Sequence, residues 1–184
     1  MLKINNVILI KDISEIRKCF TDMSVVVNDT YELNNVVISY NEYPKPKKDL
    51  PTKTDEEERE WIFEEINSAI NKIRRHRYTR KAIIYNLHVS GLKHNCLNLF
   101  HLYYRKKKLY LNVYVRSMNF TDNFEHDMYT FDTVLNIACK KLKLNKGQVI
   151  VFIMSLHKFN VTLTSFKKRR KIKKNKRIKE NKYG

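Results

Sequence analysis

The second half of the chain carries side chains that together could do covalent chemistry on a nucleotide. In chain order these are Cys96, the neighbours Arg116 and Ser117, Asp127 and His157. A cysteine becomes a nucleophile when nearby positive charge favours its thiolate, and the guanidinium of an arginine matches the oxygens of a phosphate. The set therefore predicts a nucleotide site that contains its own nucleophile.

Taken one at a time, three of these residues also have plainer interpretations. Cys96 stands close to His94 and just before a strand-like run, where a buried structural thiol is common. Asp127 alone fits a solvated loop carboxylate or a helix cap. His157 follows an apolar run, and a lone histidine there more often satisfies a hydrogen bond than binds a ligand. Their combination, rather than any one of them, indicates a site.

The basic candidates also have two interpretations each. Arg116 ends a run whose residues alternate regularly, and an arginine on a sheet face needs a partner. That partner is either a phosphate or a salt bridge to Glu125 or Asp122. Arg80 and Lys81 come directly before an apolar run, so they either bind phosphate or form a solvated entry to a strand.

Apolar patterns predict the elements that must position these side chains. One helix is expected to begin near Asp55 and to carry apolar residues from Ile62 to Ile73 at helical spacing. A second carries the apolar stripe from Phe131 to Leu142 and stops over Leu144–Gly147. Strands are expected at 25–27, 36–40, 82–85, 97–104, 109–116 and 149–154. The sum is an α+β domain with a mostly antiparallel sheet and two principal helices.

Composition excludes several classes of protein. The 184 residues suit one domain, expected over residues 1–165. No apolar run is long enough for a membrane span, and the charged N-terminus is not a signal peptide. Only three glycines occur, so a glycine-rich phosphate loop is excluded. The three widely spaced cysteines favour reduced thiols in a cytoplasmic protein over a disulfide framework or a zinc site.

The net charge of +18 is concentrated at the C-terminus. Residues 166–184 are predicted to form a disordered basic tail, because eleven lysines and arginines between Lys167 and Lys182 face one Glu180. Such a tail would attract nucleic acid in a salt-dependent way. It could equally serve only to solubilise or localise the protein.

Residues from about 65 to 159 resemble thymidylate synthase and its relative deoxycytidylate hydroxymethylase. The motifs that carry the resemblance are Arg80-Lys81 before a strand, Asn95-Cys96-Leu97, and Arg116-Ser117. The distances from Cys96 to Arg116, Asp127 and His157 match the family without a gap. The resemblance implies a thymidylate synthase-like fold, with a mostly antiparallel or mixed sheet, flanking helices and a homodimer formed through the sheet.

The resemblance also implies a mechanism. The Cys96 thiolate would add to C6 of a pyrimidine nucleotide, and C5 would then attack the one-carbon unit of 5,10-methylenetetrahydrofolate, giving a methyl or a hydroxymethyl product. Arg116 and Ser117 would hold the 5′-phosphate together with Arg80 and Lys81 from the partner subunit. In the same way, His157 would contact the sugar hydroxyl.

Asp127 stands where thymidylate synthase has the asparagine that reads uracil. An aspartate there is the pattern of the cytosine-using hydroxymethylases, since a carboxyl group can pair with N3 and the amino group of cytosine. The resemblance therefore implies dCMP as a substrate as well as dUMP, with the base preference tilted toward cytosine.

Other positions depart from the family pattern. Asn119 replaces the folate-side aspartate, and Phe159 replaces a tyrosine and so lacks its hydroxyl. The C-terminal segment that closes over folate in the family is a basic tail here. The catalytic glutamate of the family has several candidates around Trp61, namely Glu58, Glu60, Glu64 and Glu65.

Three hypotheses follow. The first is a homodimeric transferase that methylates or hydroxymethylates dUMP or dCMP. The second is a non-catalytic relative that keeps the nucleotide pocket or dimer surface and binds RNA or DNA through the tail. The third is a small basic nucleic-acid-binding protein whose resemblance is accidental. The retained Cys96, Arg116 and His157 favour the first, whereas Asn119 and Phe159 favour the second.

Overall fold

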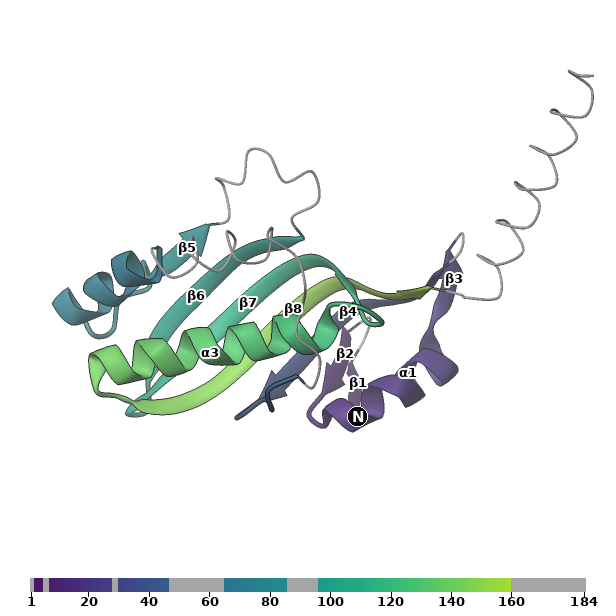
Figure 1. Ribbon diagram of the computed structural model, residues 1–184, viewed down its shortest axis with the longest axis horizontal. Helices are drawn as coiled ribbons and strands as arrows, with labels where there is room; N and C mark the ends of the chain where they lie inside the picture. Colours follow the sequence, from purple (N-terminus) through teal and green to yellow (C-terminus); the bar gives the residue numbers. More distant parts are fainter. Residues whose placement is uncertain (1, 5–6, 28–29, 47–64, 86–95, 160–184) are drawn as a thin grey trace, which may run out of the picture.

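The computed structural model of the chain describes residues 2–4, 7–27, 30–46, 65–85 and 96–159. These residues form one eight-stranded sheet, and α3 (Phe124–Leu142) lies across one of its faces (Figure 1). Residues 65–75 are also helical, and α1 (Ile16–Met23) follows a short 3-10 turn at Ile13–Glu15. The strands are β1 (Leu2–Ile4), β2 (Val7–Ile10), β3 (Val25–Val27), β4 (Thr30–Tyr40), β5 (Ile83–Tyr85), β6 (Leu97–Arg105), β7 (Lys108–Asn119) and β8 (Asn145–Phe159).

The sheet is mixed, with the spatial order β1-β2-β4-β8-β7-β6-β5 and β3 paired to β4. The β2–β4 and β7–β8 pairs are parallel, and the remaining pairs are antiparallel. β7 and β8 can be parallel because α3 connects them and returns the chain to the same end of the sheet. The α+β class predicted from the sequence is confirmed.

The structure differs from the sequence prediction in two details. The segment before β3, for which no helix was predicted, contains α1, which places Ile16, Cys19 and Phe20 at helical spacing and buries all three. The helix stop predicted over Leu144–Gly147 falls earlier: α3 ends at Leu142, and Lys143, whose φ of 53° is left-handed, follows it. Because that single residue turns the chain, β8 begins at Asn145 and already includes Gly147.

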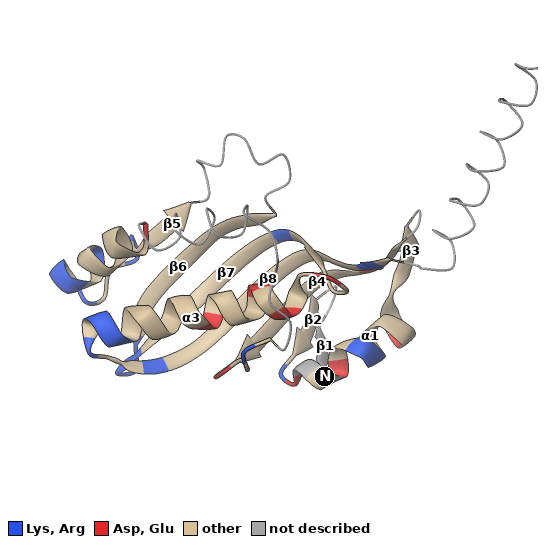
Figure 2. Ribbon diagram, viewed as in Figure 1, with Lys and Arg blue, Asp and Glu red and all other residues tan. Residues whose placement is uncertain are grey.

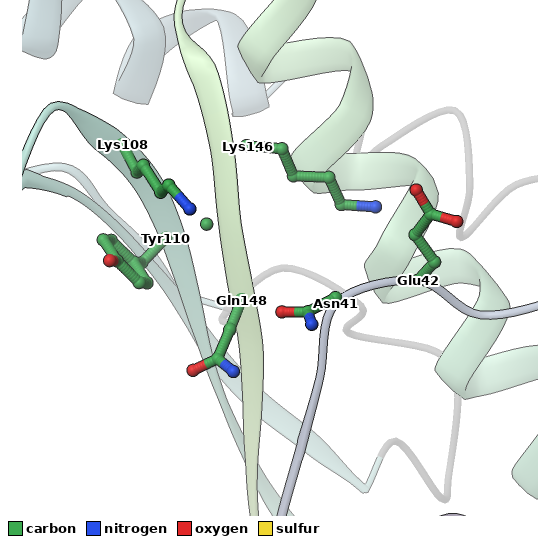
Figure 3. Close-up of a pocket in the computed structure, with 7 residues that line it drawn as sticks. Asn41, Glu42, Lys108, Tyr110, Lys146 and Gln148 are labelled. Carbon is green, nitrogen blue, oxygen red and sulfur yellow. The ribbon is translucent and has the colours of Figure 1, made fainter.

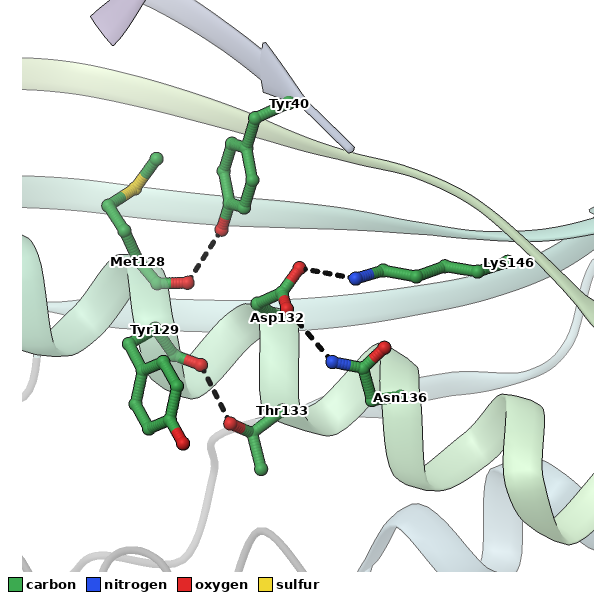
Figure 4. Close-up of polar contacts among 7 residues, drawn as sticks. All are labelled: Tyr40, Met128, Tyr129, Asp132, Thr133, Asn136 and Lys146. Atoms are coloured by element: carbon green, nitrogen blue, oxygen red, sulfur yellow. Dashed lines mark hydrogen bonds and ion pairs between the residues drawn. The ribbon is translucent and has the colours of Figure 1, made fainter. Parts of the chain in front are cut away.

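Polar contacts fasten α3 to the sheet (Figure 4). The Asp132 carboxylate, almost fully buried, accepts hydrogen bonds from Lys146 Nζ at 2.8 Å and from Asn136 Nδ2 at 2.9 Å. The Tyr40 hydroxyl donates to the carbonyl of Met128 at 2.7 Å. These bonds satisfy polar groups that would otherwise be costly to bury, so they fix the helix in one position.

The sheet face opposite α3 has a different character. Along β7, Leu109, Leu111 and Val113 are buried against the helix layer, while the residues between them point to the other face. Aromatic rings stack there across neighbouring strands: Tyr103 on Tyr110 with centroids 5.2 Å apart, and Tyr114 on Phe152 at 4.7 Å. Tyr114 is 38% exposed, so in this single chain the aromatic face meets solvent.

Candidate nucleotide site

A break in the alternation of β7 brings Arg116 and Ser117 to the same face. In a regular strand, neighbouring side chains point to opposite faces. Here Val115 and Met118 are both buried, and the two residues between them are exposed or half-buried. Adjacent side chains of β7 can therefore serve one site on the face opposite the helices.

The neighbouring strands break at the same level. In β8, Met154 and Ser155 lie between the buried Ile153 and Leu156. In β4, the break falls at 34–35, and Asn35 has a left-handed φ of 56°. Because the three strands break together, their pairing continues without a shift across this level.

Beyond the break, three neighbouring strands present polar side chains side by side. The register pairs β4 with β8 and β8 with β7, so that partner residues share one face. We call this group the polar patch, and its members are Glu32, Asn34, Ser155, His157, Ser117 and Asn119. The core residues Leu33, Leu156 and Met118 face the other way. Three members of the polar patch were predicted from the sequence: Ser117 and Asn119 on β7, and His157 on β8.

Hydrogen bonds connect the polar patch. Ser117 Oγ and His157 Nδ1 are 3.2 Å apart, so two predicted site residues are in direct contact. Ser155 Oγ donates to a carboxylate oxygen of Glu32 at 3.3 Å. Asn119 is engaged in the turn after β7, where its Nδ2 donates to Asp122 at 2.7 Å and its Oδ1 accepts from Thr121 N at 2.9 Å.

Cys96 lies beside the break. The backbone N–H of Arg116 donates to the carbonyl of Cys96 at 2.8 Å, which places the cysteine at the start of β6 next to the Arg116–Ser117 pair. All three cysteines are thiols, but only Cys96 is half-buried, whereas Cys19 and Cys139 are buried. Cys96 is thus less buried than the other two thiols, although it also packs against the hydrophobic core.

Arg116 is exposed, and in the part of the chain that the structure describes it makes no ion pair within 4 Å. Asp122, one partner proposed from the sequence, instead accepts from Asn119. The salt-bridge interpretation of Arg116 is thus not realised in these residues. Its guanidinium is available on the same face as the polar patch.

Asp127 lies in the first turn of α3, where its backbone N–H donates to the carbonyl of Asn123 at 2.9 Å. Its charge is a minor contributor to the raised pKa of Tyr40, after burial, Asp132 and Tyr43. This places Asp127 in the helix layer near the end of β4. Its base-reading role stays a prediction.

Arg80 and Lys81 are exposed and lie far from Cys96 along the sheet. Leu102 N donates to the carbonyl of Ala82 at 3.0 Å, so Lys81 lies level with Tyr103, seven residues along β6 from Cys96. At about 3.3 Å per residue, this separation is roughly 23 Å. Within one chain, the two basic side chains cannot share a phosphate with Arg116.

Other lysines and arginines of the described residues gather at the same end, where α3 and the helical residues 65–75 finish (Figure 2). Arg74 donates to the carbonyl of Lys141 at 3.2 Å, and Lys141 Nζ donates to Asn67 Oδ1 at 2.6 Å. These basic side chains are therefore partly used to join the two helices.

A pocket of about 280 Å³ lies at the other end of β7 and β8 from the polar patch (Figure 3). Its lining residues are Asn41, Glu42, Lys108, Tyr110, Lys146, Gly147 and Gln148. Arg116 is eight residues along β7 from Lys108, which at about 3.3 Å per residue is a distance of about 26 Å. None of the residues predicted for catalysis lines this pocket.

Some predicted features lie outside the described residues. These are the basic tail from Lys167 to Lys182 and the glutamates Glu58, Glu60 and Glu64; only Glu65 is described, half-buried at the start of the helical residues 65–75. In the described part of the chain, no helix is long and apolar enough to cross a membrane. The same residues contain no group of three His, Cys, Asp or Glu side chains that could hold a metal ion.

The chain matches a known protein family. A family model described as thymidylate synthase matches residues 25–181, which is most of the chain and includes every residue of the polar patch. No match was found among curated proteins.

Proposed function

This chain belongs to the thymidylate synthase family, and we propose that it transfers a one-carbon group to C5 of dUMP or dCMP through a covalent adduct at Cys96. Family membership supports pyrimidine methyl transfer, and hence a transferase, in general. The observation that carries the proposal further is the contact of Ser117 with His157 on the face where Arg116 lies, next to Cys96, whose carbonyl accepts from the backbone N–H of Arg116.

The described residues would divide the work as follows. The Cys96 thiolate would form a bond to C6 of the pyrimidine, which raises electron density at C5 and makes that carbon nucleophilic. The exposed guanidinium of Arg116 would hold the 5′-phosphate. The family motif assigns Ser117 to the phosphate as well, but its one hydroxyl hydrogen would go to His157 Nδ1, 3.2 Å away. His157 would contact the sugar. The resemblance assigns the base to Asp127, with cytosine favoured, but Asp127 lies in the helix layer and not in the polar patch, so this role rests on the resemblance alone.

In this proposal, 5,10-methylenetetrahydrofolate would supply the one-carbon unit and, for a methyl product, a hydride. Asn119 is the described residue that the family pattern assigns to the folate side. Its amide donates to Asp122 and accepts from Thr121, which leaves one N–H and one lone pair with which Asn119 would contact the folate.

The proposal includes a homodimer formed through the aromatic sheet face. Arg80 and Lys81 can complete a phosphate site only from a second copy, because each is roughly 23 Å from Cys96 in its own chain. On that face, His101 Nε2 and Asn112 Oδ1 are buried yet have no hydrogen-bond partner among the described residues. A second sheet would cover the stacked rings and offer partners to these two atoms.

Release of tritium from C5 of labelled dCMP and dUMP, with and without methylenetetrahydrofolate, tests the proposal. We expect release by the wild-type protein and by Cys139→Ala, a matched control at another thiol, and none by Cys96→Ala. The faster substrate reports the base. Absence of release while nucleotide still binds would instead support a non-catalytic relative that acts through its basic tail.

A further inference from the structure

Glu32 contributes a carboxylate to the polar patch, and none of the family motifs assigns a role to it. It lies on β4 directly opposite His157 on β8, and His157 in turn lies beside Asn119 on β7. Glu32 is half-buried. It is the sole acidic member of the patch, at the opposite corner from the exposed Arg116.

The carboxylate of Glu32 retains acceptor capacity. Ser155 Oγ donates to Oε2 at 3.3 Å, and Thr30 Oγ1 lies 3.3 Å from Oε1. Thr30 has one hydroxyl hydrogen, and its 2.9 Å bond to the carbonyl of Val27 is shorter. Since that hydrogen goes to Val27, Oε1 still has lone pairs for an incoming donor.

His157 supplies the complementary group. When Ser117 donates to Nδ1 across 3.2 Å, the second ring nitrogen, Nε2, carries the proton and is a donor. A hydrogen-bond donor and an acceptor then stand on adjacent strands, about 5 Å apart at the backbone. One ligand hydroxyl can use both, because it accepts through its oxygen and donates its proton. A phosphate cannot, since it brings negative charge and no proton to the carboxylate.

We propose that Glu32 is a further sugar-binding residue of this site, and that it accepts the hydrogen bond of the sugar hydroxyl that His157 contacts. The assignment rests on the proposed nucleotide site. Arg116 and Glu32 are two strands and three residues apart, about 14 Å between Cα atoms. In this arrangement the phosphate lies beside Arg116 and the sugar hydroxyl lies beside Glu32. The two residues together fix the direction in which the nucleotide binds.

A binding experiment with matched ligands tests the assignment. Affinities for dCMP, dUMP and 2′,3′-dideoxycytidine monophosphate are measured by calorimetry for the wild type, Glu32→Ala and Glu32→Gln. Glu42→Gln, a carboxylate at the far end of β4, is the control. Thermal unfolding confirms that each variant folds, and Glu32→Gln keeps the test intact if the alanine variant does not.

We expect Glu32→Ala to weaken dCMP binding about tenfold or more, as for loss of a hydrogen bond to a charged group. Glu32→Gln should lose less, and neither variant should change binding of the dideoxynucleotide. Equal losses for dCMP and the dideoxynucleotide would overturn the assignment, as would tighter binding of both. A changed ratio of dCMP to dUMP affinity would assign Glu32 to the base and overturn it too. No nucleotide binding by the wild type would instead contradict the proposed function itself.

Discussion

Two of the three cysteines, Cys19 and Cys139, lie in surroundings that oppose the thiolate form. Burial raises the pKa of Cys139 to about 11 and also raises the pKa of Cys19. At pH 8, a thiol of pKa about 11 is ionised in roughly one molecule in a thousand. Cys96 is half-buried, so it is the most accessible of the three.

We therefore predict that iodoacetamide at pH 8 modifies Cys96 before the other two in the native protein. Because only the thiolate reacts, raising the pH toward 11 should increase labelling of Cys139. Peptide mass spectrometry after timed quenching measures each site, and a urea-unfolded sample, in which all three should react, is the control. Preferential native labelling of Cys19 or Cys139 would contradict the burial described here.

At this scale, the sequence was informative where a site residue stands next to a recognisable neighbour. Arg116 and Ser117 are adjacent, and His157 follows an apolar run, so all three could be named before the fold was known. Glu32 could not, because only the pairing of β4 with β8 brings it opposite His157, 125 positions later. The alternation of Glu32, Leu33 and Asn34 was visible, but its partner strand was not.

Among the elements, α3 is joined to β8 by a buried ion pair in addition to its buried apolar residues. The side chain of Asp132 is 6% exposed, and Lys146 is the positive charge that compensates it at 2.8 Å. Removing one partner of a buried pair leaves an uncompensated charge, which costs far more than the pair itself contributes.

Accordingly, Lys146→Met should lower the free energy of unfolding by about 3 kcal/mol. Lys140→Met, at an exposed lysine of the last turn of α3, should change it by less than about 0.5 kcal/mol. Urea unfolding monitored by circular dichroism gives both values. A loss below about 1 kcal/mol for Lys146→Met would mean that Asp132 is neutral or finds another partner.

Long elements with a clear period could be predicted from sequence, and short ones could not. The alternation along β7 and the apolar stripe of α3 each extend over many residues, which averages out exceptions. α1 has eight residues, and its short apolar set gave little signal. Gly147 suggested a stop, yet it lies in β8, at a position that suits glycine because an added Cβ would come within 2.7 Å of the Tyr110 ring.

For the whole molecule, the stacked and partly exposed rings of the aromatic face predict that two chains pair through this face. We predict that the wild-type protein sediments with twice the chain mass and that Phe152→Glu sediments as a monomer. A carboxylate on this face would have to be buried without a counter-charge. Analytical ultracentrifugation measures both species.

Ser68→Glu, on the exposed surface of the helical residues 65–75, is the control and should remain a dimer. The monomeric variant should also lose phosphate binding if Arg80 and Lys81 of the partner subunit complete the site. A dimeric Phe152→Glu protein would place the interface on another surface.

The coincident break in β4, β7 and β8 also constrains how this protein can evolve. Deleting Arg116 alone would restore regular alternation in β7, yet it would set the residues beyond it one position out of register with β8, so that the core residue Met118 would lie opposite Ser155. Only deletions made together in neighbouring strands would preserve the register. Each strand thereby fixes the irregularity of its neighbour, so we expect a single-residue deletion at this level to destabilise the sheet even where no ligand contact is lost.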